Sequence, residues 1–306
     1  MADKTLLLGL SLFKKQHQPY VTLEELYKPV STLGKALRRV HFNSALPAKK
    51  IWMNELGSQV EAHDTIILSA KPFSFHVARV IDQLGIKGKR FIFWYWNPVA
   101  LMGHPAGVSQ NWESWSFDRQ DAKQYGLKYN GTYYFDSFVH ETAAVGVPET
   151  DVYFIGQDKS RFEILKTLEQ QLAAQGVRTD IHIVRDRTSA AHNRNQYRPK
   201  ADYAAILQKV AGSKALLDIC QEGQTGMTQR VMEALFFGKK LITNNPALRD
   251  EDFYHPDHIH ILGEDASEAI PAFIEKPVAP VPDAVRDSFL FRNWLRRLLE
   301  DKPLQP

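Results

Sequence analysis

The sequence predicts an α/β protein made of two doubly wound, mostly parallel sheets. Three observations predict it: short apolar runs recur along the chain, helical patterns separate many of them, and polar or glycine-containing stretches follow several runs. Strands joined through helices pair in parallel, and this alternation is typical of doubly wound domains. The 306 residues are enough for about two domains of ~150 residues each.

In the first half of the chain, apolar runs predict strands and periodic segments predict helices. We expect strands over residues 5–10, 65–70, 90–96 and 112–118, and helices over 72–84 and 118–126. The second helix has Asp118 in the N-cap position and Gly126 just past its end, a common pairing of start and stop residues.

The second half alternates more regularly. It predicts strands at 151–156, 179–184, 214–220, 239–245 and 259–262, with helices at 161–176, 201–211 and 227–237. Residues 140–151 have the composition of a hinge, and 275–285 are rich in proline. We therefore expect an N-terminal domain over 1–145, a C-terminal domain over 146–280, and a terminal helix within 281–306. Packing of that helix against the N-terminal domain is one arrangement open to it.

The composition excludes some classes of protein. Apolar residues make up 44% and charged residues 24%, and the net charge of +3 is spread without a basic stripe, so we expect no nucleic-acid partner. The single Cys220 cannot form an internal disulfide. No apolar run approaches the ~18 residues of a membrane span, and no cleavage-like site follows the N-terminus, so we expect a cytoplasmic protein.

The C-terminal stretch "RNWLRRLLE" is basic and amphipathic. One interpretation is a packed terminal helix with a solvated polar face. The other is a peripheral contact with the cytoplasmic face of an inner membrane. The oligomeric state has no signal in the sequence.

The stretch "FIFWYWNPV" predicts a buried strand that ends at the edge of the sheet. Phe91, Phe93 and Tyr95 alternate with Ile92 and two tryptophans, so both faces are apolar, as in an inner parallel strand. Trp96 and Asn97 fall at its carboxyl end, where Pro98 stops the ladder. They are candidates for contact with a ligand, and Trp96 also fits a structural role.

The most informative segment is "LDICQEGQTGMTQRVMEALFFGKKLITNN" at 217–245. A loop with Gly223 and Gly226 joins a strand to a helix, an arrangement that suits a phosphate because backbone N–H groups face the positive end of the helix dipole. Arg230 is one turn into the helix and could pair with the anion. The alternative is a helix capped at Thr225 or Gly226, with Arg230 and Glu233 forming an ordinary i, i+3 pair.

This segment resembles the donor-binding segment of GT-B glycosyltransferases, which have two Rossmann-like domains. Further similarity lies in "WYWNP", "WSFDRQDAKQYGLKYN", "YFIGQDKSR" and "DEDFYHPDHIHIL". Together these stretches are similar to bacterial enzymes of lipopolysaccharide core, capsular and exopolysaccharide biosynthesis. The resemblance implies transfer of a sugar from a nucleotide-sugar donor to such an acceptor, with the nucleotide sugar as co-substrate and no separate cofactor.

The resemblance also implies which residues hold the donor. The loop after the first strand of the second domain would contact the diphosphate or sugar, and Glu233 would hold the ribose. The donor-binding residues expected are Gly156, Gln157, Asp158, Arg161, Glu222, Gly223, Gln224, Thr225, Gly226, Met227, Thr228, Arg230 and Glu233. Many retaining members have a second glutamate where this chain has Thr225, so the stereochemical outcome stays open.

Catalysis needs a cation at the leaving phosphate and, in an inverting enzyme, a base near the acceptor hydroxyl. Arg230 is the first candidate for the cation, with the loop at 223–228, Arg161, Lys159 and Arg185 as others, and Arg230→Ala is expected to weaken donor binding while leaving the fold intact. Asp118 is the candidate base, although a helix N-cap is its competing role. Asp136, His104 and His17 are further candidates.

Two patterns resemble metal sites, and we expect neither to bind a metal. Asp250 and Asp252 lie in a polar loop and not at the end of an apolar strand. His255, His258 and His260 lack the cysteines or carboxylates of a zinc-type set. The basic stretch 185–200 is either a mobile loop that contacts phosphate or an exposed linker.

Two other functions remain open from the sequence. A nucleotide-sugar epimerase on the same fold would act without an acceptor. A non-catalytic nucleotide- or sugar-binding module would bind the donor and leave it unchanged.

Overall fold

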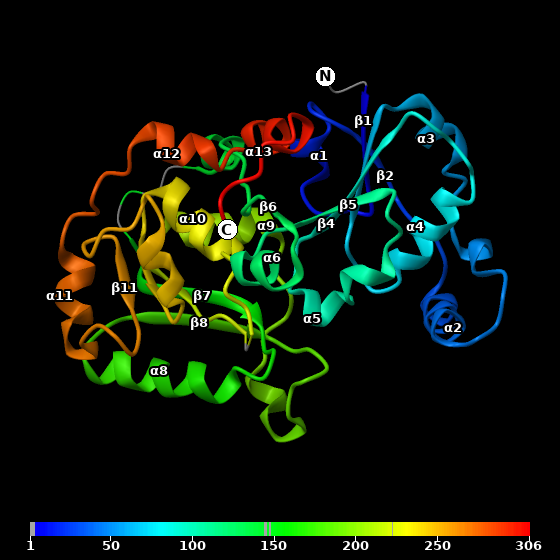
Figure 1. Ribbon diagram of the computed structural model, residues 1–306. Helices are drawn as coiled ribbons and strands as arrows, with labels where there is room; N and C mark the ends of the chain where they lie inside the picture. The colour runs from blue at the N-terminus through cyan, green and yellow to red at the C-terminus, as the bar shows by residue number, and fades with distance from the viewer. Residues whose placement is uncertain (1–3, 144–145, 147, 222) are drawn as a thin grey trace. The chain divides into compact units, whose positions relative to one another are not determined.

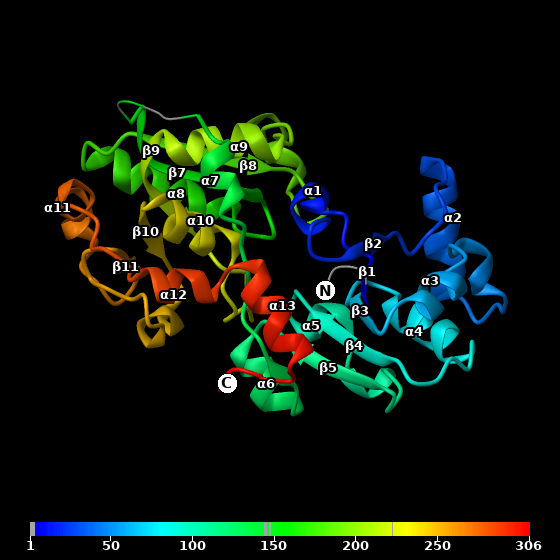
Figure 2. The same cartoon turned by 90° about the horizontal axis from the view of Figure 1, so that it is seen from above.

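The computed structural model describes residues 4–143, 146, 148–221 and 223–306 (Figures 1 and 2). The chain forms two compact units. Unit 1 consists of residues 1–131 and 294–306, and unit 2 of residues 132–293. The chain thus changes unit at 131/132 and again at 293/294, whereas the sequence places the boundaries at 145/146 and 280/281.

Unit 1 contains a parallel sheet of six strands in the order β2-β1-β3-β4-β5-β6. The strands are β1 (Thr5–Leu8), β2 (Thr22–Glu24), β3 (Thr65–Ser69), β4 (Arg90–Tyr95), β5 (Trp112–Ser116) and β6 (Lys128–Tyr129). The helices are α1 (Lys14–His17), α2 (Thr32–Asn43), α3 (Gly57–Ala62), α4 (Ser74–Asp82), α5 (Val99–Met102) and α6 (Arg119–Tyr125), with 3₁₀ turns η2 (Lys49–Trp52) and η3 (Pro105–Gly107).

Strand β4 is buried on both faces, as its sequence predicts. Phe91, Phe93 and Tyr95 belong to one apolar cluster with residues of α3 and α4. On the other face, Trp94 packs edge-on against Trp294 of α13 (Phe291–Leu299), with ring centroids 4.9 Å apart. Trp294 and Leu298 are fully buried. The terminal helix therefore completes the core of unit 1.

Unit 2 contains a parallel sheet of five strands in the order β11-β10-β9-β7-β8. The strands are β7 (Thr150–Gln157), β8 (Thr179–Val184), β9 (Ser213–Asp218), β10 (Lys240–Thr243) and β11 (Ile259–Ile261). The helices are α7 (Ser137–Glu141), α8 (Phe162–Ala174), α9 (Tyr203–Ala211), α10 (Gln229–Phe237), α11 (Ile270–Glu275) and α12 (Asp283–Ser288), with 3₁₀ turns η4 (Ala191–Gln196), η5 (Pro246–Asp250) and η6 (Ser267–Ala269).

Apolar side chains fill the two faces of this second sheet. Val152, Phe154, Leu217 and Ile242 pack with α8 and α11 on one side. Because all five strands run in parallel, their carboxyl ends meet along one edge of the sheet, which is where open α/β sheets bind ligands. None of the helices in the described part of the chain combines the length and the apolar character that a bilayer crossing requires.

Candidate functional site

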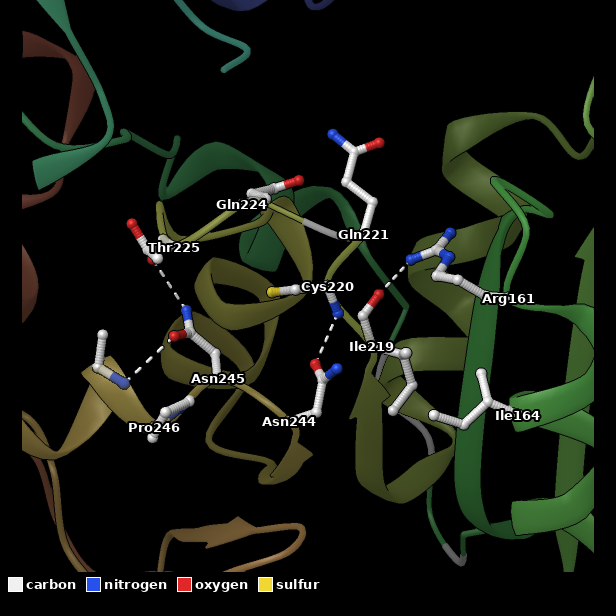
Figure 3. A pocket seen from close by; sticks show the side chains of 11 residues that line it. Arg161, Ile164, Ile219, Cys220, Gln221, Gln224, Thr225, Asn244, Asn245 and Pro246 are labelled. Atoms are coloured by element: carbon white, nitrogen blue, oxygen red, sulfur yellow. Dashed lines mark hydrogen bonds between the residues drawn. The ribbon is translucent and has the colours of Figure 1, made fainter. Parts of the chain in front are cut away.

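A pocket of about 360 Å³ opens at the carboxyl ends of β9 and β10, beside the start of α8 (Figure 3). It is lined by Arg161, Ile164, Ile219, Cys220, Gln221, Gln224, Thr225, Asn244, Asn245, Pro246 and Ala247. Among the described residues of this lining, Arg161 is the one cationic side chain and none is a carboxylate. These described side chains suit a polar anion.

The junction between β7 and α8 is held by Asp158. Its Oδ1 accepts hydrogen bonds from the backbone N–H groups of Arg161 and Phe162, both 3.0 Å long, and its Oδ2 accepts one of 2.6 Å from the Tyr197 hydroxyl. Asp158 is 2% exposed. Asp158 therefore holds the loop in place from within the protein and is not among the residues that line the pocket.

The turn between Asp158 and Arg161 places two consecutive residues in the left-handed region, Lys159 at φ 46° and Ser160 at φ 61°. Their N–H groups donate to Asp186 Oδ2 at 3.1 Å and Thr188 Oγ1 at 2.9 Å. The basic stretch 185–200 is thus attached to this turn by Asp186, Thr188 and Tyr197. Burial lowers the pKa of Lys159, and the neighbouring Arg161 charge lowers it further.

The guanidinium of Arg161 is bound by main-chain carbonyl groups. Nη2 donates to Gln157 O at 2.5 Å, Nε donates to Asp158 O at 3.2 Å, and Nη1 donates to Ile219 O at the end of β9 (Figure 3). Among the described residues no carboxylate forms an ion pair with it. Burial lowers its pKa, an effect that the nearby Asp218 and Cys220 oppose. The positive charge at the pocket is therefore fixed in place but not neutralised by contact.

Gly156 makes room for this guanidinium. A Cβ atom at this position would lie 3.0 Å from Phe154 Cζ and 3.1 Å from Arg161 Nη2. The glycine in "FIGQD" thus lets the arginine lie close to the strand. This is a steric role, and it differs from the donor contact that the sequence resemblance implies.

The junction between β9 and α10 is organised around Asp218, which sequence analysis did not single out. Asp218 is 3% exposed; its Oδ1 accepts the Thr228 hydroxyl at 2.8 Å and its Oδ2 accepts the Thr243 hydroxyl at 3.0 Å. Burial raises its pKa, although these hydrogen bonds and the charge of Arg230 oppose the change. Asp218 therefore ties the start of α10 to the end of β10.

Thr228 is the N-cap of α10, a role the sequence had offered to Thr225 or Gly226. Its hydroxyl oxygen accepts from the N–H groups of Arg230 at 3.1 Å and Val231 at 3.4 Å. Two of the N–H groups expected to face a phosphate are therefore used by the helix's own cap.

Arg230 and Glu233 form a buried ion pair within unit 2. Arg230 Nη1 contacts Glu233 Oε2, and the side chains are 11% and 0% exposed. Glu233 Oε1 also accepts the Tyr203 hydroxyl at 3.0 Å, and Tyr203 in turn contacts the Tyr134 hydroxyl at 3.1 Å. Burial raises the pKa of Glu233, and Arg230 opposes the change. Neither residue lines the pocket described above.

The remaining donor candidates fall into several positions. Gln224 and Thr225 line the pocket, Gly223 is exposed, and Gly226 and Met227 are buried. Gln157 is exposed at the end of β7. Glu222 lies outside the described residues.

Two asparagines in the pocket were missed as site residues because the sequence analysis assigned them to the end of a strand. Asn244 Oδ1 accepts the Cys220 N–H at 2.7 Å, and Asn245 Nδ2 donates to Thr225 O at 3.0 Å (Figure 3). They fix the loop after β9 to the end of β10. Polar residues directly after an apolar strand are the signal that could have identified them.

In unit 1, the sheet brings Trp96, Asn97 and Asp118 to the same edge, because β4 and β5 are parallel neighbours and Tyr95 pairs with Ser116. Trp96 is half-buried and Asn97 is exposed. Asp118 is 2% exposed and caps α6, with Oδ1 accepting the N–H groups of Gln120 at 2.9 Å and Asp121 at 3.1 Å. These contacts favour its capping role.

The other candidate bases are placed as follows. His17 is buried, and this burial lowers its pKa to about 4. His104 caps the 3₁₀ turn η3 by accepting the Ala106 N–H at 3.1 Å. Asp136 belongs to unit 2 and pairs with Arg292 at 3.3 Å.

No protein-family model and no curated protein sequence matches the chain. Among solved structures, AviGT4, a glycosyltransferase involved in avilamycin A biosynthesis, superposes with a TM-score of 0.52 at 12% identity, over 97% of this chain and 96% of that one. The kitacinnamycin glycosyltransferase gives 0.49 at 11% identity, over 99% and 100%. UDP-GlcNAc 2-epimerase of Methanocaldococcus jannaschii, in complex with UDP-GlcNAc and UDP, gives 0.49 at 10%, over 97% and 99%.

The match to AviGT4 extends over nearly the whole of both chains, and both units of the present chain are parallel α/β domains. The chain therefore has the two-domain fold of GT-B glycosyltransferases.

Proposed function

We propose that the chain is a glycosyltransferase that moves a sugar from a nucleotide-sugar donor to a glycan acceptor without a metal ion. The observation that supports this most directly is the pocket in unit 2. It lies where parallel α/β sheets bind ligands and holds an arginine whose charge no carboxylate of the described chain contacts.

In this proposal the donor diphosphate occupies the pocket beside Arg161. A guanidinium has five N–H donors. Three carbonyl contacts orient it without neutralising it, so it can stabilise the charge that develops on the leaving diphosphate. Asn244, Asn245 and Gln224 supply polar groups around it. Arg161 therefore replaces Arg230 as our leading candidate for the cation.

The acceptor class rests on the sequence resemblance alone. We propose a bacterial lipopolysaccharide or polysaccharide acceptor, as in the enzymes that the stretches "WYWNP" and "YFIGQDKSR" of this chain resemble. The sugar, the base of the nucleotide and the stereochemical outcome are not part of the proposal.

The first test is thermal stabilisation of the purified protein by UDP, GDP, ADP, dTDP and CMP and by their common sugar donors. A ligand that binds only the folded state raises the melting temperature by mass action. We expect one nucleotide class to stabilise the protein, and Arg161→Ala to remove the shift. No shift with any member of the panel would contradict the proposal.

Turnover then separates the three functions. A transferase consumes the donor only when an acceptor is present, and we expect this to continue after chelation of divalent metals. Conversion of the donor to its epimer without acceptor, with free nucleotide as an intermediate, would indicate an epimerase. Binding without any consumption, over a panel of acceptors, would indicate a binding module.

The role of Asp118 can be tested with Asp118→Asn, which keeps an oxygen for the helix cap. Since the carboxylate is buried and caps α6, we expect transfer to be unchanged. Loss of transfer with normal thermal stability would restore Asp118 as the base.

A further inference from the structure

Helix α2, the turn η2 and the loop between them carry large apolar side chains that are exposed on unit 1. The exposed fractions are 71% for Leu33, 55% for Leu37, 68% for Val40, 63% for Leu46 and 54% for Ile51. Leu33, Leu37 and Val40 follow i, i+4, i+7 spacing and therefore share one face of α2. We call these five side chains the α2 surface. An apolar helix face that the protein does not bury marks a place of contact with something else.

Only the end of α2 is anchored to the core of unit 1. Phe42 is its one buried residue and stacks on Phe73 with ring centroids 4.9 Å apart. Arg38 lies over the Tyr27 ring at 4.4 Å. In Figure 2 the helix extends away from the strands of its own sheet. The α2 surface is therefore presented outward by a helix that Phe42 holds in place.

The chain segment that carries this surface holds positive charges only. Residues 26–54 contain no Asp or Glu and six cations, more than the net charge of +3 of the whole chain. They are Lys28, Lys35, Arg38, Arg39, Lys49 and Lys50. In the part of the chain that the structure describes, none of the six forms an ion pair with a carboxylate. Glu24 and Glu25 line a hollow together with Lys28, Lys35 and Arg38, whereas Arg39, Lys49 and Lys50 are not part of that lining. The apolar face is thus bordered by an excess of positive charge.

This combination identifies the class of partner. A nucleic acid would be attracted by the cations, but it offers no apolar surface to bury the leucines. A bilayer with anionic lipids offers both, since exposed leucines enter the boundary of the acyl chains while Lys and Arg meet the head groups. We propose that α2 and η2 form a membrane-docking surface that binds bilayers containing anionic phospholipid.

The same observations argue against the terminal helix as the membrane contact. α13 has the basic amphipathic pattern, but its apolar residues Phe291, Trp294, Leu295 and Leu298 are buried in the protein. The sequence pattern alone cannot distinguish the two helices. The proposal concerns a surface of unit 1 and does not depend on the proposed glycosyl transfer.

The experiment is flotation of the full-length protein with vesicles of phosphatidylcholine alone or of phosphatidylcholine with phosphatidylglycerol. We expect binding to the second kind, weakened by high salt because anionic attraction is screened. Absence of binding at low salt, or equal binding to both kinds of vesicle, would overturn the proposal.

Two pairs of matched variants locate the contact. Leu33→Gln with Leu37→Gln should reduce vesicle binding at least about tenfold, since two leucines lose their burial in the bilayer. The control is Leu84→Gln with Leu101→Gln, which removes two leucines that are 43% and 54% exposed elsewhere on unit 1. Equal binding by these two double variants would refute the assignment to α2.

The second pair of variants tests the contribution of the positive charges to vesicle binding. Lys35→Gln, Arg39→Gln and Lys50→Gln together should reduce binding to anionic vesicles by about a hundredfold. The control with the same change in net charge is Lys15→Gln, Lys87→Gln and Lys123→Gln, three exposed lysines of unit 1. If the controls lose binding equally, the attraction is a property of net charge and not of this surface.

If the leucine double variant instead abolishes self-association of the protein in solution, the partner of the α2 surface is a second copy of the chain and the proposal is wrong.

Discussion

Arg161 and Arg230 occupy similar places in unit 2 and have different surroundings. Each stands near the start of a helix that follows a parallel strand. Arg161 is bound by carbonyl groups and faces a pocket, whereas Arg230 is buried against Glu233. The position of a cation at a helix start therefore does not decide whether it can bind an anion. What decides it is whether a carboxylate already pairs with the cation.

The largest expected effect breaks the buried pair. Arg230→Ala leaves the Glu233 carboxyl fully buried and without its cation, and the loss of one partner of a buried pair costs about 3–5 kcal/mol. Urea unfolding should show that the free energy of unfolding falls by this amount. Such a loss would contradict the expectation from sequence that Arg230→Ala leaves the fold intact.

The control is the double variant Arg230→Ala with Glu233→Gln, which removes the uncompensated charge and should recover part of the stability. A loss below about 1 kcal/mol in the single variant would show that water reaches Glu233 and that the pair is not structural.

The second effect is on binding. Arg161→Ala should weaken nucleotide binding by about tenfold or more, because a charge-assisted hydrogen bond contributes roughly 1.5–3 kcal/mol. Stability should fall by only about 1 kcal/mol, since Ile219 lines the open pocket and Gln157 is exposed, so their carbonyl groups can bind water. Calorimetry of nucleotide binding measures the first quantity, with Arg187→Ala, an exposed arginine of the same unit, as control. Equal affinity in both variants would remove Arg161 from the site.

A smaller effect is expected from Gly156→Ala. The new methyl group would meet Phe154 and Arg161 at about 3 Å, so the guanidinium must shift by a few tenths of an ångström. We expect affinity for the nucleotide to fall several-fold. Gly57→Ala is the matched control, because a methyl group there meets no atom within 4 Å. An unchanged affinity would mean that the position of Arg161 is adjustable.

The smallest effect is a change in pH dependence. Burial raises the pKa of Glu233, so the folded chain binds a proton at a pH where the unfolded chain has released it. The contribution of this group is greatest below the ordinary glutamate pKa of about 4.3 and is lost as pH rises through the folded pKa. Relative to wild type, Glu233→Gln should therefore gain stability as pH rises from mildly acidic to neutral. The opposite slope in urea unfolding would show that the pair with Arg230 dominates.

The fold was predictable because its principal strands are continuous apolar runs, and all nine expected strand regions contain a strand. The elements that were missed lack that signal. β2 (Thr22–Glu24) is short and half-buried throughout, and β6 has two residues. Helix α2 was missed although it is periodic, because its apolar stripe faces outward and is interrupted by charges.

The site was predictable only in part. The loop after β7 follows a clear strand, and this places Arg161 near the edge of the sheet from sequence alone. The role of Arg230 depends on Glu233 and on Tyr203, which lies 30 residues from Glu233 in the chain. Such a partnership arises from tertiary packing, and no local pattern records it.

The return of the chain to unit 1 has a consequence for synthesis. Where the chain enters and leaves unit 2, Tyr134 N–H donates to Phe289 O at 2.8 Å and Phe291 N–H donates to Tyr134 O at 2.9 Å, so the entering and leaving segments lie side by side. The core residue Trp294 of unit 1 follows all of unit 2 in the sequence. During synthesis on the ribosome, unit 1 emerges first but cannot complete its core until α13 has been made. Unit 2 can fold as one uninterrupted segment.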